Sequence, residues 1–562
     1  MGSVAPFLIF FLGAVLVAAT RGRVQSVLLL AIPVIGALNL FAMTDGPQMT
    51  VQLLGYTLTL VRVDKLSLLF GYLFHLAAFI GILFSLHVED RSQHAAGVLY
   101  AGSAIGAVFA GDLITLFLFW EVLAVSSVFL VFARGTEPAY RSGMRYLVIQ
   151  ILSGVILMAG VLMRVHETGS IAFDAIELTG PGAWLILIAI GIKCGFPLAH
   201  NWLTDAYPEA TPTGTVLLSA FTTKVAVYAL ARSFAGTELL VYVGATMTMF
   251  PIFFAVIEND LRRVLAYSMV NQIGFMVCGI GLGTALAVNG AVAHAFNDVI
   301  FKGLLFMSMG AVLMRTGTTK ASELGGLYKS MPWTTTFCMV GAASISAVPL
   351  FSGFVSKSMV MVAALEEGHP VVWLLLLFAS AGVLEHAGIK IPYFAFFAHD
   401  SGKRPAEAPA NMLLAMGLAA AICIFIGCYP AALYALLPYP VDYVPYTLEH
   451  VVTQLQLLVF ATLAVVVLML TNLYPPEVRG INIDFEWTYR KILPAIVQFL
   501  HHRLGYAWVQ VRGVVSAPAA SLLAGLYRHH GPRGVLGRQW PTGNMAFWTT
   551  VLLGGCLIFY YI

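Results

Sequence analysis

Lysine rather than arginine occupies the apolar stretches of this chain. The sequence holds ten lysines and twenty arginines, yet five lysines and no arginine fall well inside apolar segments. These five are Lys193, Lys224, Lys302, Lys357 and Lys390. Arginine keeps its charge at any attainable pH, whereas a buried lysine can lose its proton. Because a buried cation costs about 3 kcal/mol even on lenient membrane-insertion scales, the pattern predicts groups that bind and release protons.

Acids and histidines accompany these lysines. The set comprises Glu121, His294, Asp298, Glu385 and His386. Glu121 interrupts the apolar run FLFWEVLAVSSVFLV, and Glu385 and His386 lie about one turn before Lys390. His294, Asp298 and Lys302 follow one another at four-residue spacing, which places them along one face of a helix. The arrangement favours a buried proton pathway; the alternative is a set of ion pairs that only fixes helix packing.

The elements that must hold these groups are membrane-spanning helices. Of the 562 residues, 59% are hydrophobic and 10% are charged, and the mean hydropathy is +0.87. A soluble domain carries about 25% charged residues. Apolar runs close to the ~20 residues that a helix needs to cross a bilayer recur along the chain. We therefore predict an all-α membrane protein with about 16 transmembrane helices, and a short surface hairpin where residues 49–62 alternate evenly.

Two of the predicted spans contain prolines that should interrupt them. Pro197 follows Lys193, and Pro349 precedes Lys357. Proline removes a backbone donor and clashes with the preceding turn, and unwound backbone at membrane depth needs protein or water around it. Broken helices of this kind mark the ion site in many transporters. Each broken span is followed by a second lysine in the next span, so the sequence predicts two five-helix repeats; because five is odd, they are inverted.

The sequence divides into six predicted parts, and its loop charges give an orientation. The parts are 1–93 (three helices and the hairpin), 94–234 (first repeat), 238–398 (second repeat), 411–473 (helices 14 and 15), 474–544 (a polar segment) and 545–562 (helix 16). Thirteen lysines and arginines lie in loops after odd-numbered spans, against four after even-numbered ones. The positive-inside rule then predicts an inner membrane protein with its N-terminus outside. Segment 474–544 is predicted to lie along the cytoplasmic face of the membrane.

Motifs for metals, cofactors and nucleic acids are missing from the sequence. The six cysteines are scattered, without a CxxC pair or metal-ligand spacing. The net charge of +3 comes without a run of lysine or arginine that would suggest nucleic acid. The glycines between 279 and 283 follow no predicted strand, which argues against a nucleotide site. We predict no metal and no cofactor, and lipid as the surrounding medium.

Five stretches carry a resemblance to a known family. They are FLFWE (117–121), IKCGFPLAHNWLTDAYPEATPTGTVLLSAFTTKVAVYAL (192–230), ENDLRRVLAYSMVNQIGFM (258–276), HAFNDVIFKGLLFMSMGAVL (294–313) and PLFSGFVSKSMV (349–360). The chain resembles the antiporter-like subunits shared by respiratory complex I, membrane-bound hydrogenases and Mrp-type multi-subunit Na⁺/H⁺ antiporters. The resemblance implies a 14-helix core with broken helices 7 and 12.

The resemblance also assigns expected roles to residues. It implies that Glu121 and Lys193 form a gating pair and that Lys224 is a bridging lysine. It implies central positions for His294 and Lys302 and an ionisable group on broken helix 12, which is Lys357. The resemblance supports less for Glu385, His386 and Lys390, whose roles rest mainly on the lysine pattern.

Within the family, the stretches LSAFTTKVAVYALAR and INIDFEWTYRK are similar to the D-type chain of Mrp antiporters. The longest complex I subunit has a histidine just before helix 8. That histidine is absent from this chain, which has Phe221 and Thr222 in this region. We therefore expect a proton-translocating subunit of a cation (Na⁺)/proton antiporter, with other membrane subunits as partners. The alternatives are an antiporter-like subunit of a redox-driven complex, and a membrane scaffold whose lysines only pair structurally.

Overall fold

The computed structural model describes residues 4–53, 55–480, 482–531, 534 and 542–561. The chain forms two compact units, Met1–Asn482 and Ile483–Ile562. In the second unit a π-helical turn, η5 (Thr488–Ile492), leads into the long helix α21 (Leu493–His530), and α22 (Thr542–Tyr561) follows. The division between the units falls after Asn482, so the first residues of the predicted polar segment 474–544 belong to the large unit.

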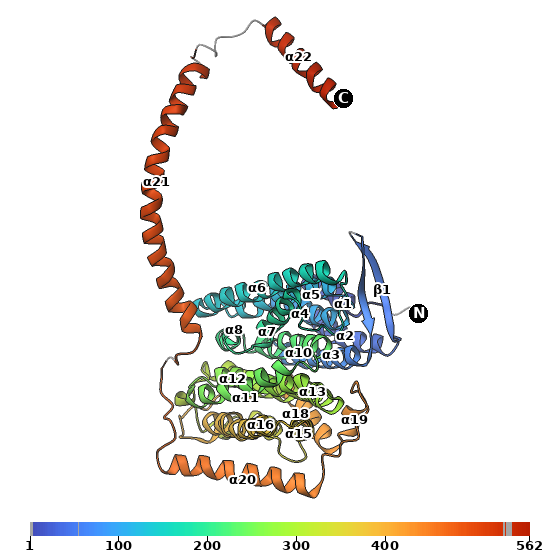
Figure 1. Ribbon diagram of the computed structural model, residues 1–562. Helices are drawn as coiled ribbons and strands as arrows, with labels where there is room; N and C mark the ends of the chain where they lie inside the picture. The colour runs from blue at the N-terminus through green and yellow to red at the C-terminus, as the bar shows by residue number, and fades with distance from the viewer. Residues whose placement is uncertain (1–3, 54, 481, 532–533, 535–541, 562) are drawn as a thin grey trace. The chain divides into compact units, whose positions relative to one another are not determined.

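The first half of the large unit is drawn in blue to green in Figure 1. Its elements are α1 (Pro6–Ala19), α2 (Gly22–Leu40), β1 (Gly46–Leu53), β2 (Tyr56–Val63), α3 (Lys65–Ser85), α4 (Arg91–Phe109), α5 (Leu113–Phe132), α6 (Glu137–Thr168), α7 (Pro181–Cys194), α8 (Asn201–Ala206), α9 (Gly214–Ala220) and α10 (Thr222–Ser233). Strands β1 and β2 pair antiparallel, from Gly46 opposite Val63 to Leu53 opposite Tyr56, and form a hairpin beside the helices.

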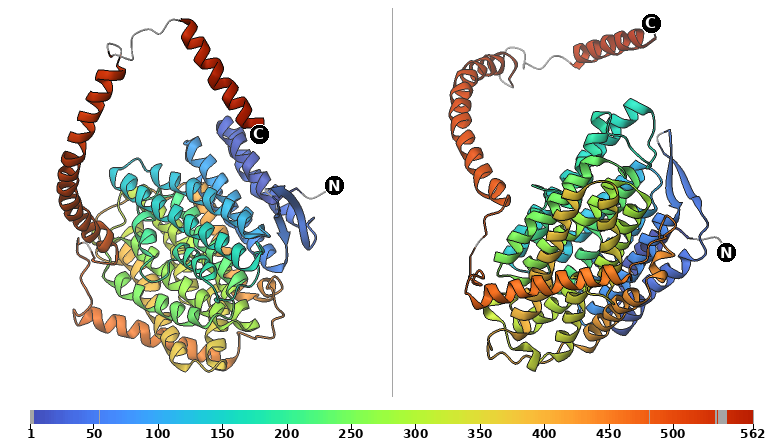
Figure 2. Two further views of the ribbon diagram at one scale, coloured as in Figure 1. Left: turned by 45° about the horizontal axis from the view of Figure 1, so that its top comes forward. Right: turned by 60° about the horizontal axis from the view of Figure 1, so that its bottom comes forward.

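The second half of the large unit packs against the first (Figures 1 and 2). Its helices are α11 (Glu238–Ile257), α12 (Leu261–Leu282), α13 (Ala285–Thr316), η1 (Ala321–Glu323), η2 (Leu327–Lys329), α14 (Pro332–Ile345), α15 (Ser352–Glu366), α16 (Pro370–Val383), η3 (Leu384–Ile389), α17 (Lys390–Pro392), η4 (Tyr393–Phe397), α18 (Ala410–Cys428), α19 (Ala431–Tyr434) and α20 (Leu448–Leu470). Of these, η1 and η2 are 3-10 turns, whereas η3 and η4 are π-helical. Helix α20 lies at the edge of the bundle and exposes most of its surface.

The predicted all-α membrane fold is confirmed. Within the described residues, thirteen helices are long and apolar enough to cross a membrane, and Pro6–Ala19 and Pro181–Cys194 are shorter apolar helices. Helices α12 and α13 are almost entirely buried, whereas α2 and α20 present apolar side chains outward. Apolar exposure of this extent suits lipid rather than water, because acyl chains are as apolar as the side chains that meet them.

Both predicted helix breaks are present. Helix α7 ends at Cys194, Gly195 takes a left-handed conformation with φ of 80°, and the helix resumes as α8 at Asn201. Helix α14 ends at Ile345 and resumes as α15 at Ser352. Pro197 and Pro349 lie between the two pieces in each case, where a missing amide hydrogen and ring clash end the helix.

A third interruption carries no proline and was not predicted. Phe221, with φ of −105° and ψ of −64°, separates α9 from α10 within the predicted span 214–234. The amide of Thr222 after the break donates to the hydroxyl of Tyr100 at 3.0 Å, so a side chain of α4 satisfies the backbone there. A tertiary contact therefore stabilises this break, and the residues around it carry no local signal for it.

Candidate functional site

Lys193 lies fully buried in the last turn of α7 and faces α5. Its ammonium donates to the carbonyl oxygen of Trp120 at 2.6 Å and lies 4.4 Å from the centre of the Trp120 ring. Glu121, the next residue on α5, interacts with Lys193 electrostatically, but the described residues show no direct ion pair between the two. The Glu121 carboxylate instead packs against Gly154 of α6, where even one extra carbon would overlap it. The two groups are thus close enough to interact electrostatically, but they do not form a direct ion pair.

Lys224 and Asp298 form an ion pair in the interior of the unit. The ammonium of Lys224 on α10 lies 2.5 Å from Oδ2 of Asp298 on α13, and neither side chain is exposed. Lys224 also donates to the carbonyl of Ser219 at 3.3 Å, just before the break at Phe221. Asp298 therefore pairs with a lysine from the other half of the unit. Its four-residue spacing from His294 and Lys302 had suggested that it acts with those two residues on its own helix.

Lys302 and His294 bind polar side chains of α12 and α15. The ammonium of Lys302 donates to Oγ of Ser268 at 2.7 Å. The ring nitrogens of His294 lie 3.0 Å from Oε1 of Gln272 and 3.1 Å from Oγ of Ser356. Asp298 also interacts electrostatically with Lys302 and with Lys357, so one carboxylate serves three lysines.

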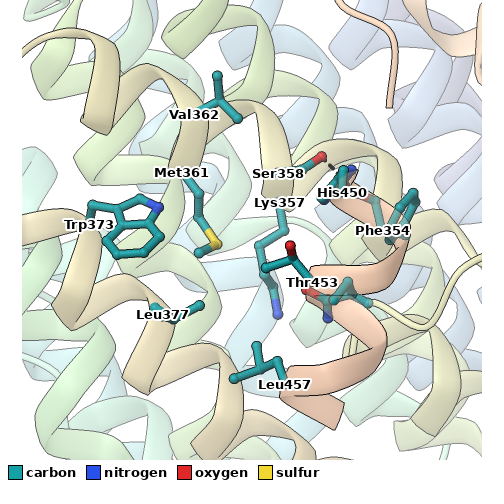
Figure 3. A pocket seen from close by; sticks show the side chains of 12 residues that line it. Phe354, Lys357, Ser358, Met361, Val362, Trp373, Leu377, His450, Thr453 and Leu457 are labelled. Carbon is teal, nitrogen blue, oxygen red and sulfur yellow. Dashed lines mark hydrogen bonds between the residues drawn. The ribbon is translucent and has the colours of Figure 1, made fainter. Parts of the chain in front are cut away.

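Lys357 extends from α15 toward a cavity of about 110 Å³ bordered by α15, α16 and α20 (Figure 3). Its ammonium donates to the carbonyl of Ile345 at 3.0 Å and lies 5.1 Å from the centre of the Phe275 ring. His450 and Thr453 of α20 line the cavity across from it. The polar side chains of α20 thus bring hydrogen-bonding groups next to this lysine.

Lys390 directly follows the π-helical segment η3. This segment interrupts the regular α-helix of the last predicted span of the second repeat. The side chain is fully buried, donates to the carbonyl of Val256 at 2.6 Å and pairs with Glu477 at 2.8 Å. Glu385 accepts a hydrogen bond from the hydroxyl of Tyr474 at 2.8 Å, and His386 is buried beside it. Both Tyr474 and Glu477 come from the chain after α20, which the sequence assigned to a separate polar segment.

Three of these lysines share a mode of binding. The acceptor carbonyls of Lys224, Lys357 and Lys390 belong to the last turns of α9, α14 and α11. Carbonyls at a helix end have no partner within the helix and carry about half a negative charge together. Each helix end therefore adds a partial negative charge beside a buried ammonium. For Lys224 and Lys390 this partial charge adds to the full charge of a carboxylate, that of Asp298 or of Glu477.

Metal ligands are not assembled in the described part of the chain: no group of three or more His, Cys, Asp or Glu side chains converges there. Four of the six described cysteines are buried, and no disulfide joins any two of the described cysteines. The candidate site is therefore a set of buried lysines with carboxylate, imidazole, hydroxyl and carbonyl partners.

Residues 110–382 match the family described as NADH:quinone oxidoreductase/Mrp antiporter, TM. That range contains Glu121, the broken helices and four of the five buried lysines. Over nearly half of its length, the chain is therefore similar to antiporter-like membrane subunits. Lys390 lies just beyond the matched range, and its partner Glu477 lies much further along the chain.

Relatives of this antiporter-like subunit include chains from several kinds of complex. Hydrogenase-4 component B of Escherichia coli is 28% identical over 65% of this chain and 62% of its own length. The D-type chain of the Na⁺/H⁺ antiporter of Alkalihalophilus pseudofirmus is 32% identical over 50% of this chain and 62% of its own length. The alignments thus span about three fifths of each of these two relatives.

Two solved assemblies contain chains with the same fold. A chain of the Mrp complex from Dietzia sp. superposes with a TM-score of 0.65 at 21% identity and covers 77% of this subunit and 91% of that chain. A chain of the membrane-bound sulfane sulfur reductase, an archaeal respiratory membrane complex, superposes with a TM-score of 0.72 at 21% identity and covers 99% of both chains.

Several polar residues that contact the buried ionisable groups of this antiporter-like subunit were not predicted from the sequence. They are Ser268, Gln272, Ser356, Tyr474 and Glu477. Ser268 and Gln272 stand four residues apart in an apolar span, which places them on one face and could have drawn attention to them. Glu477 gave no such signal, because it lies outside every predicted span.

Proposed function

We propose that this subunit conducts protons along a line of buried groups within a multi-subunit cation/proton antiporter. The line runs through Glu121, Lys193, Lys224, Asp298, Lys302, His294 and Lys357. Relatives named as chains of Na⁺/H⁺ antiporters support Na⁺ as the exchanged cation and other membrane subunits as partners.

The observation that carries this proposal is the Lys224–Asp298 pair. It joins α10 of the first predicted repeat to α13 of the second, with both charges removed from solvent. Desolvating two ions costs several kcal/mol each, and an apolar pair of similar size would pack at least as stably. A buried ion pair that does not improve stability, and that adjoins the helix break at Phe221, points to a role in which protons move through the pair.

Coupling along the line follows from Coulomb interactions at low dielectric. When Lys193 gains a proton, its charge attracts the Glu121 carboxylate and repels other ammonium groups. A proton that reaches Lys224 is stabilised by Asp298, which at the same moment is less able to stabilise Lys302 and Lys357. One shared carboxylate thus makes neighbouring lysines compete for charge, and this competition moves protons in sequence.

We propose an orientation with the N-terminus outside, and contacts between loops agree with the division of the loops into two sides that it requires. Arg134 and Arg262, from loops predicted to be cytoplasmic, both donate to the carbonyl of Pro208, at 2.6 and 2.8 Å. On the opposite face, Arg232 pairs with Asp64 at 2.7 Å, and both belong to loops predicted to be outside. Loops that are predicted to lie on the same side of the membrane are therefore in contact with one another.

The decisive experiment measures proton transport in membrane vesicles that contain the intact complex. Lys193→Ala and Glu121→Gln should each abolish most transport at normal abundance, because each removes a proton-carrying group. Glu137→Gln is the matched control, since Glu137 forms an exposed ion pair with Arg141 and touches none of these groups. Near-normal transport in both test variants would support the scaffold function and reject the pathway.

A second candidate is an antiporter-like subunit of a redox-driven complex. Its support is the likeness to hydrogenase-4 component B, which extends over 65% of this chain, about as far as the 66% matched by the A-type antiporter chain of A. pseudofirmus. Purification of the intact assembly followed by mass spectrometry separates the two candidates. Co-purifying redox subunits would indicate the second, and their replacement by further antiporter subunits would indicate the first.

A further inference from the structure

The segment that follows α20 returns to the bundle and brings an acid to the last buried lysine. Glu477 lies 2.8 Å from the ammonium of Lys390, and its side chain is 7% exposed against 0% for Lys390. Further along the same segment, Arg479 pairs with Glu323 at 2.8 Å and Asn482 donates to Glu258 at 3.0 Å. The segment is thus held at defined points, and Glu477 occupies a specific position within it.

Glu477 lines a cavity that is open to the molecular surface. It measures about 550 Å³, and its lining includes Ser322, His399, Tyr474 and Glu477. A water molecule takes about 30 Å³ in the liquid, so the cavity has room for many. Ser322 and His399 belong to the loops after α13 and η4, which carry basic residues and are predicted to face the cytoplasm.

Other ionisable groups face this pair from each neighbouring element. Glu385 of η3 is joined to the segment by Tyr474, Glu258 at the end of α11 reaches it through Asn482, and His386 is buried in η3. Burial raises the pKa of Glu477, Lys390 opposes that effect, and Glu258 adds to it, so that the net pKa lies above the usual range. Near neutral pH this carboxyl therefore gains a proton more readily than an exposed one.

We propose that Glu477 is a proton-transfer site that links the water in this cavity to Lys390, and through it to the buried lysines. The inference rests on the proposed proton-conducting function. The Glu477 carboxylate takes a proton from hydronium and releases water. The resulting carboxylic acid then gives that proton to the neutral amine of Lys390, which restores the carboxylate–ammonium pair seen in the structure. His386 interacts electrostatically with Lys390, Lys302 and Lys357, so it lies where the charge would be passed onward.

The test compares two variants of the same segment in vesicles that contain the intact complex. Glu477→Gln should slow proton transport on the order of 100-fold, the lower end of what a positioned proton-transferring side chain contributes. Arg479→Gln breaks the other ion pair of the segment and should leave the rate close to that of the unmodified protein. Equal rates for Glu477→Gln and the unmodified protein would overturn the inference, and so would equal slowing by both variants.

A second measurement tests access without relying on transport. Glu477→Cys is made in a chain whose exposed cysteines, Cys428 and Cys556, are replaced by serine. A charged thiol reagent added from the cytoplasmic side should label it, and absence of labelling would overturn the inference. Lys193→Ala distinguishes the two failures: if it blocks transport while Glu477→Gln does not, only the Glu477 route is rejected.

Discussion

Replacement of Asp298 by asparagine isolates the contribution of one buried charge. The side chain keeps its shape, but Lys224 loses the carboxylate that lies 2.5 Å from its ammonium. At an effective dielectric constant of 20, that attraction amounts to about 7 kcal/mol before desolvation is counted. Removal of one partner from a buried pair costs about 3–5 kcal/mol in practice. At about 1.4 kcal/mol per factor of ten, this cost shifts the folding equilibrium toward the unfolded chain by roughly 100- to 4,000-fold.

Two measurements follow from this magnitude. Proton uptake by vesicles should fall on the order of 100-fold, because Lys224 loses the carboxylate that stabilises its charge. The melting temperature of the purified complex should fall in Asp298→Asn and recover in the double variant Asp298→Asn/Lys224→Met, which leaves no unpaired charge. Transport should stay absent in that double variant. Full transport in Asp298→Asn at normal abundance would refute the role assigned to the pair.

Three further predictions address other parts of the chain. Lys302→Arg keeps the positive charge but holds its proton, so transport should be lost while the melting temperature changes little; retained transport would favour a structural ion pair. Gly154→Ala should displace the Glu121 carboxylate without removing any charge, and should reduce proton transport in the same vesicles; an unchanged rate would show that its position is unimportant. Arg512→Cys, at an exposed position of α21, should react with an impermeant thiol reagent only from the cytoplasmic side, and labelling from outside would reverse the proposed orientation.

Local causes made the fold predictable from the sequence. Long apolar runs require helices in a membrane, because a lipid-exposed backbone must satisfy its own hydrogen bonds. Pro197 and Pro349 end helices wherever those helices lie, since the missing amide hydrogen is a property of the residue itself. The hairpin around residues 49–62 followed from strict alternation. The break at Phe221 depends on a hydroxyl of α4 and left no local trace.

Burial of the ionisable groups can be predicted from the sequence, because an ionisable side chain in a long apolar run lies within a membrane-spanning helix. Which of these groups meet depends on the tertiary structure. Periodicity predicts which face of a helix a residue occupies, but not which helix packs against that face. The four-residue spacing therefore groups Asp298 with Lys302 on the same helix, whereas the structure pairs Asp298 with Lys224. Tyr474 and Glu385 are 89 residues apart in the chain and share a hydrogen bond. Contacts of that kind depend on how whole helices pack, and that packing is set by the sum of many side chains rather than by any one segment.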